Sequence, residues 1–155
     1  MNPPIAESHF VIDFDSTLTQ VEALDVLGEI SLEHHPEKEE RLQKIKEVTD
    51  LGMAGELSLR ESIEARIEVL DANRSHLTEL IQRLSRLISK SFYRNRSFFE
   101  HNAENTYIVS NGFKDFIIPV VTQLGIKAEH VFANEFIYDE NGNIIDFNRK
   151  NVLSE

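Results

Sequence analysis

The sequence contains no cysteine, and this absence excludes several kinds of protein. Neither a disulfide framework nor thiolate chemistry can be built without it, and the composition fits a reducing compartment. The N-terminal stretch 1–8 has no cationic segment followed by an apolar one, so it is not a secretory signal. We therefore expect a cytoplasmic protein.

Long hydrophobic runs and an excess of positive charge are also missing. The longest apolar run, Phe116 to Val121, is far too short to cross a bilayer. The 16 Lys and Arg residues stand against 27 Asp and Glu residues, which gives a formal net charge of −11. Because such a protein repels nucleic acid and anionic lipid, we expect neither as a partner. A bound phosphate would need a metal ion or local donors that reverse this field.

The residues that are present predict short strands around a long helical block. With 41% apolar residues, the chain can form one domain, or a core with a small insert. The β-branched runs 10–12 and 106–109 predict buried strands. Between them, the stretch 21–99 is rich in Glu, Leu, Arg and Lys, with apolar residues at helical spacing. Ser58-Leu-Arg-Glu61 has the pattern of a helix capping box.

The C-terminal third returns to a mixed pattern. Residues 113–124 predict a helix that Gly125 caps and that Pro119 either kinks or tolerates in an early turn. Residues 131–138 predict a strand, and Asn141-Gly142 predicts a hairpin after it. Strands alternating with helices indicate a parallel α/β core.

This order predicts how the chain is divided. The helical block is too long for one crossover, so we expect it to be a cap inserted between the first two core strands. The expected segments are a core segment 1–20, a helical cap 21–89 and a second core segment 90–155. The fold class is therefore α/β, Rossmann-like, with an inserted helical cap.

Two carboxylates follow the first predicted strand directly, in Asp13-Phe-Asp-Ser-Thr-Leu-Thr19. Because side chains alternate along a strand, Asp13 and Asp15 leave it on the same side. The carboxyl end of a parallel strand faces the crevice where α/β proteins bind ligands. Ser16 and Thr17 then turn the chain and can offer hydroxyl and N–H groups.

A pair of this kind suits phosphoryl transfer. One carboxylate can attack phosphorus and form an aspartyl-phosphate, while the other donates a proton to the leaving group and later activates water. Two close carboxylates can also recruit Mg²⁺. An isolated pair would equally fit a strand end with two capping Asp residues, but the longer string after an apolar strand favours the catalytic interpretation.

The string resembles the first motif of the haloacid-dehalogenase superfamily, and Tyr-Ile-Val-Ser110-Asn-Gly112-Phe resembles its second. The resemblance implies Asp13 as nucleophile and Mg²⁺ ligand. It implies Asp15 as acid/base, with its backbone carbonyl as a second Mg²⁺ ligand. It also implies phosphate binding by Ser110, Asn111 and Gly112. The most similar members, the phosphoserine phosphatases, usually have Gly where this chain has Asn111. Asn is the non-glycine residue that best tolerates positive φ, so we expect the loop to be preserved.

The resemblance continues into the cap, where it implies substrate contacts by Glu22, Met53 and Arg66. Glu22 would lie near the substrate ammonium, Met53 would cover the substrate and Arg66 would bind its carboxylate. Helical spacing independently places Arg66 on one face with Leu59, Ile63 and Leu70. A planar guanidinium on an apolar stripe needs a partner, for which a carboxylate is suited. Without the resemblance, Arg66 could equally snorkel or pair with a Glu of the cap, and Glu22 could be a helix-dipole partner.

Two further motifs of the superfamily have no match after Ile145. One supplies a Lys and the other a Gly- and Asp-rich loop, and we do not assign the Lys role to Lys150. We therefore expect the N-terminal part of a Mg²⁺-dependent phosphoserine phosphatase of serine biosynthesis, itself inactive because its last core strands are absent. The expected partner is a small phosphorylated metabolite, and a homo-oligomer or a fused C-terminal domain is compatible with the sequence. The alternatives are another small phosphomonoester as substrate, a phosphotransferase, or a non-catalytic regulatory domain.

Overall fold

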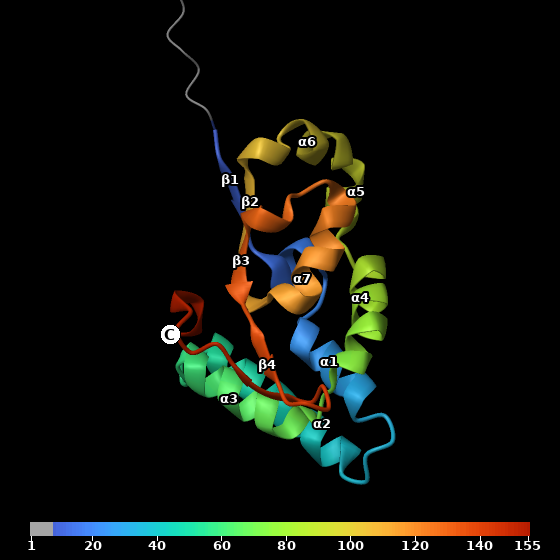
Figure 1. The fold of residues 1–155 in the computed structure, drawn as a ribbon, viewed down its shortest axis with the longest axis vertical. Coiled ribbons are helices and arrows are strands. Elements are labelled where there is room, and N and C mark those ends of the chain that lie inside the picture. The colour runs from blue at the N-terminus through green and yellow to red at the C-terminus, as the bar shows by residue number, and fades with distance from the viewer. Residues whose placement is uncertain (1–7) are drawn as a thin grey trace, which may run out of the picture.

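The computed structural model describes residues 8–155 (Figure 1). Residues 1–7, which begin the predicted core segment 1–20 and form most of the stretch examined for a signal, lie outside the described residues. Three parallel strands form a sheet in the order β1-β2-β3. Their bounds are Phe10–Ile12 for β1, Thr106–Phe113 for β2 and Val131–Asn134 for β3. The α/β class with a parallel sheet is confirmed.

Most of the helices lie between β1 and β2 in the chain. The capping box at Ser58 is confirmed, because Ser58 Oγ accepts a hydrogen bond from Glu61 N and a Glu61 carboxylate oxygen accepts one from Ser58 N. The helices are α1 (Ala23–Ser31), α2 (Lys38–Met53), α3 (Leu59–Leu70), α4 (Leu77–Arg86), α5 (Lys90–Arg94), α6 (Arg96–His101) and α7 (Lys114–Val121). The division at residues 20 and 89 remains a proposal.

One face of the sheet is covered and the other is open. Helix α7 packs against β2 and β3, and Phe113 and Phe116 are fully buried there. On the opposite face, Val11 is 66% exposed and Phe132 is 50% exposed. Phe132 of β3 is paired in register with Val109 of β2. Alternating side chains thus leave an apolar outer face on the described sheet.

The predicted helix and its stop are confirmed in outline. Helix α7 continues through Pro119 to Val121 and then tightens into a 3₁₀ turn, Thr122–Leu124. Gly125 follows with φ of +84°, the left-handed conformation expected at a C-terminal cap. No helix within residues 8–155 is long and apolar enough to span a membrane.

The prediction of a single strand over 131–138 is wrong. The chain forms β3 in the parallel sheet and then β4 (Phe136–Tyr138), which pairs antiparallel with β5 (Ile144–Phe147). Asn134 at the junction is fully buried, and its Nδ2 donates to the carbonyl oxygens of Asn111 and Leu153. The parallel pairing ends at Asn134, although the apolar pattern runs on into β4.

The β4–β5 hairpin, with Gly142 at φ of +84°, connects the start of α7 to the segment that follows α3. At its base, the Tyr138 hydroxyl donates to Asp115 at the start of α7, at 2.6 Å. At its tip, Arg74 N donates to the Gly142 carbonyl oxygen at 2.8 Å, and Ile144 N donates to Ala72 at 2.8 Å. In Figure 1 the hairpin crosses α3 on its way from the sheet.

Candidate active site

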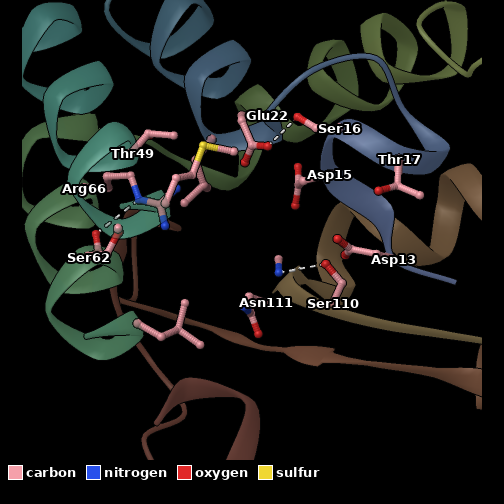
Figure 2. A pocket seen from close by; sticks show the side chains of 15 residues that line it. Asp13, Asp15, Ser16, Thr17, Glu22, Thr49, Ser62, Arg66, Ser110 and Asn111 are labelled. Atoms are coloured by element: carbon pink, nitrogen blue, oxygen red, sulfur yellow. Dashed lines mark hydrogen bonds between the residues drawn. The ribbon is translucent and has the colours of Figure 1, made fainter. Parts of the chain in front are cut away.

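Asp13 and Asp15 stand at the end of β1, where the chain enters a tight turn, Phe14–Leu18. Asp13 Oδ1 accepts a hydrogen bond from Phe14 N at 2.7 Å, which fixes the carboxylate at the strand end. Ser16 adopts φ of +53°, a left-handed conformation that costs a non-glycine residue about 1 kcal/mol. The turn directs both carboxyl groups into a cavity of about 440 Å³ (Figure 2).

The two carboxyl groups have different surroundings. The pKa of the Asp15 carboxyl is raised to about 7, chiefly by burial. The charges of Glu22 and Asp13 act in the same direction, while a hydrogen bond from Ala23 N and the charge of Arg66 oppose the shift. The latter bond joins Ala23 N to Asp15 Oδ1 at 2.7 Å. Asp13 is exposed to solvent on the cavity side. Near neutral pH, Asp15 can therefore exist in both its acid and its base form.

The loop at the end of β2 forms the second wall. Ser110 Oγ accepts a hydrogen bond from Gly112 N at 2.9 Å. A Cβ atom at Gly112 would lie 2.9 Å from Asp15 Oδ2, so only glycine lets the loop approach the carboxyl so closely. Asn111 does not need the left-handed conformation considered from the sequence, because Ser16 and Asp71 are the non-glycine residues with positive φ in the described chain.

Helices α1, α2 and α3 form the opposite wall, which holds Arg66. Its Nε donates to the Ser62 carbonyl oxygen at 3.1 Å. No ion pair of Arg66 within 4.0 Å occurs in residues 8–155. Burial lowers the pKa of Arg66, while the acids Asp25, Asp15 and Glu22 oppose this shift in that order. Figure 2 shows Arg66 on one side of the cavity and Asp13 on the other.

All eight residues singled out from the sequence line this one cavity, so the sequence-distant motifs meet in space. Glu22 accepts a hydrogen bond from Ser16 Oγ at 2.5 Å, and Met53 is 68% exposed at the rim. Their individual roles remain proposals. The residues are Asp13, Asp15, Glu22, Met53, Arg66, Ser110, Asn111 and Gly112.

Sequence reasoning missed Thr49, Gly52 and Ser62, which also line the cavity. A Cβ atom at Gly52 would lie 2.9 Å from Ser62 Oγ, so this glycine allows α2 and α3 to pack closely. Ser62 lies four residues before Arg66 and therefore on the same helix face, a spacing that could have revealed it. Thr49 gave no signal, because a lone Thr on an amphipathic helix is ordinary.

The oxygen atoms available at Asp13 and Asp15 are of the kind that Mg²⁺ prefers. Within residues 8–155, no group of three or more His, Cys, Asp or Glu side chains is placed to hold a metal ion. Mg²⁺ is commonly held by one or two carboxylates and several waters, so the donor set fits that ion.

The chain is similar to known proteins over most of its length. The family described as haloacid dehalogenase-like hydrolase matches residues 10–152. The phosphoserine phosphatase of Drosophila melanogaster is 26% identical over 144 residues, which cover 92% of this chain and 50% of that protein. That of Lactococcus lactis is 28% identical over 139 residues, which cover 90% of this chain and 59% of that protein.

The fold has a solved counterpart of similar topology. The phosphoserine phosphohydrolase-like protein from Francisella tularensis has a TM-score of 0.83 and 26% sequence identity to this chain. The match covers 95% of this chain and 67% of that one. The chain spans 50% and 59% of the two curated relatives named above.

Proposed function

Because the chain belongs to the haloacid dehalogenase-like hydrolases, we propose that it carries the nucleophile half of a phosphoserine phosphatase site. One observation carries this proposal: Asp13, Asp15 and Arg66 share a single cavity. Similarity to phosphoserine phosphatases from an insect and a bacterium supports the choice of substrate.

In the proposed reaction, a carboxylate oxygen of Asp13 attacks phosphorus and the P–O bond to the substrate breaks. The departing alkoxide takes the proton of Asp15, whose pKa near 7 suits this transfer. Asp15 then accepts a proton from a water molecule as that water attacks phosphorus. The bond to Asp13 breaks, which releases phosphate and restores the free carboxylate.

The other residues of the cavity fit the rest of phosphoserine. Ser110 Oγ and the N–H groups that follow it can bind the phosphate oxygens. Arg66 can form a two-point pair with the substrate carboxylate, and Glu22 can accept from its ammonium group. The Asp13 carboxylate and the Asp15 backbone carbonyl would hold Mg²⁺, which would supply positive charge to neutralise the phosphoryl oxygens.

Kinetics on the product of the natural gene test this proposal. We expect Mg²⁺-dependent hydrolysis of phosphoserine that Asp13→Asn abolishes, because an amide does not attack phosphorus. Arg66→Ala should raise KM for phosphoserine by a factor of about 30 or more, since a lost buried charge pair costs about 2–5 kcal/mol. Phosphoethanolamine, which lacks the carboxylate, should be little affected. Hydrolysis that survives Asp13→Asn would refute the mechanism.

A binding domain without turnover is the second candidate, and one observation favours it. Arg66 is the basic residue among the described cavity-lining residues, and it lies across the cavity from Asp13. Phosphoryl transfer depends on neutralising charge at the phosphoryl oxygens, and the described residues place no Lys there. We therefore expect negligible turnover by the 155-residue chain alone. Steady phosphoserine hydrolysis by this purified chain, lost in Asp13→Asn, would contradict the expectation.

A further inference from the structure

Asn134 is a fully buried polar residue at the end of β3, outside the set of residues that line the cavity. Its Nδ2 donates to the Asn111 carbonyl oxygen at 3.0 Å and to the Leu153 carbonyl oxygen at 2.9 Å. The first of these bonds reaches the loop that forms the second wall of the cavity. Asn134 therefore contacts the candidate active site through the backbone of Asn111, without facing the cavity itself.

The ladder between β2 and β3 is interrupted where this loop lies. Val109 pairs with Phe132, and the next printed pair joins Phe113 to Asn134. Four steps along β2 thus match two steps along β3, which makes this part of β2 a bulge. A bulge leaves backbone groups without partners in the ladder. The Asn134 side chain supplies the partner for one of them, the carbonyl oxygen of Asn111.

The carbonyl of Asn111 and the N–H of Gly112 belong to one planar peptide group. Asn134 Nδ2 holds the oxygen of this group, and Ser110 Oγ accepts its N–H at 2.9 Å (Figure 2). The peptide is therefore fixed at both ends. Because the two groups point in opposite directions in a trans peptide, a carbonyl held by Asn134 keeps the N–H on the side of Ser110.

This arrangement decides what the Ser110 hydroxyl can do. A hydroxyl has one proton to donate and two lone pairs that accept. The bond from Gly112 N uses one lone pair, and it is the one hydrogen bond of the Ser110 side chain in the described part of the chain. Ser110 lines the cavity, so its own proton can be donated to an anion that enters there.

The other end of the Asn134 amide is unsatisfied. Its Oδ1 is buried and has no hydrogen-bond partner within residues 8–155. A buried acceptor without a donor destabilises a fold, and an apolar side chain would avoid that cost. An apolar side chain would, however, leave the Asn111 carbonyl oxygen without the donor that Nδ2 provides. Packing alone therefore does not account for an amide at this position.

We propose that Asn134 is a positioning residue for the loop that binds phosphate. By holding the Asn111–Gly112 peptide, it keeps the Gly112 N–H on Ser110 Oγ and leaves the Ser110 proton directed toward a phosphate oxygen. This inference rests on the proposed function, because it concerns the phosphate contact of that same site.

Binding of inorganic phosphate to the natural protein in the presence of Mg²⁺, measured by calorimetry, tests the inference. Asn134→Ala should raise the Kd for phosphate about tenfold, the lower end for loss of a hydrogen bond to a charged group. Asn151→Ala is the matched control, because Asn151 Nδ2 donates to the Ala133 carbonyl oxygen at 2.8 Å, on the same strand but away from the loop. This control should leave the Kd unchanged. Equal Kd values for the two variants would overturn the proposal.

A double-variant cycle shows whether Asn134 acts through Ser110. Ser110→Ala and the double variant Ser110→Ala/Asn134→Ala should bind phosphate equally weakly, because no hydroxyl is left to be misdirected. Losses that multiply would mean that Asn134 only supports the fold, and they would contradict the proposal. If Ser110→Ala weakens binding while Asn134→Ala does not, the inference fails and the proposed function stands. If Ser110→Ala has no effect, the proposed phosphate site itself is wrong.

The unsubstituted protein offers a second measurement, which does not depend on how well Asn134→Ala folds. Exchange of the Asn134 Nδ2 protons, followed by NMR, should be slow both with and without phosphate, because Nδ2 bonds to two carbonyl oxygens inside the fold. Exchange at the rate of a free side-chain amide would show that the Asn111–Gly112 peptide is not held, and the proposal would then be wrong.

Discussion

The carboxyl group of Asp15 couples the chemistry of the cavity to the stability of the fold. Its pKa is about 7 in the folded chain against an ordinary value of 3.8, so the folded state holds this proton more tightly than the unfolded state. Stability should therefore fall as pH rises from about 4 to about 7. The cause is the burial of a carboxyl group that must ionise. Above pH 7 this group is charged in the folded state, so the full free-energy cost of burying the charge is present.

Asp15→Asn should remove this dependence. At pH 8 the variant is expected to be more stable than the parent, by an amount on the order of 3 kcal/mol, because it has no buried charge to form. Below pH 4 the difference should vanish. Urea unfolding at several pH values measures it, with exposed Asp50→Asn as the control. Parallel pH profiles for Asp15→Asn and the parent would exclude a raised Asp15 pKa.

At the scale of the element, α3 presents Arg66, and its first turn depends on Ser58. The capping box satisfies N–H groups that the start of a helix leaves free. Ser58→Ala should destabilise the fold by about 1 kcal/mol. Ser97→Ala, an exposed serine in α6, should change stability little. Chemical unfolding compares the two, and equal effects would mean that the cap does not stabilise α3.

Local chemistry explains which elements the sequence could predict. The cap at Ser58, the left-handed Gly125 and the hairpin glycine Gly142 are each specified by a few neighbouring residues. The break between β3 and β4 is not, because the contacts of buried Asn134 at this point are with Asn111 and Leu153, which are distant in the chain. Periodicity cannot reveal a change of sheet that leaves the apolar alternation intact.

The candidate site divides in the same way. Asp13, Asp15 and Ser110 follow strands, so their meeting at one edge of the sheet could be predicted from the chain order. Thr49 could not, since it lies on α2, and the sequence does not fix how that helix packs against the rest of the site. The loop after β2 is formed without a positive φ at Asn111. The tolerance of Asn for that conformation, which the sequence suggested as the reason, is therefore not what preserves the loop.

At the scale of the whole molecule, the described sheet has open strands at both ends of its order. β1 pairs with β2 alone in residues 8–155, and Val11 exposes 66% of its surface beside that edge. An apolar strand edge invites pairing with another chain. We therefore expect the 155-residue chain to self-associate at micromolar concentration or above.

Val11→Lys should reduce this association, because a charged side chain opposes close approach at the edge. Val152→Lys is the matched control, since Val152 is 78% exposed and lies in the 3₁₀ turn Val152–Ser154, outside the sheet. Sedimentation velocity measures both. A monomeric parent, or an equal effect of the two variants, would show that the edge of β1 is not the contact.

The β4–β5 hairpin also constrains how the cavity can open. Its tip is bonded to Ala72 and Arg74 beyond α3, while its base is bonded to Asp115 on α7. Arg149, after β5, adds an ion pair with Glu64 of α3. Any hinge motion that lifts α3 away from the sheet must therefore carry the hairpin tip with it and bend the chain near Glu135, between β3 and β4. A spectroscopic probe on the hairpin would then report the opening of the cavity, although the hairpin itself does not line that cavity.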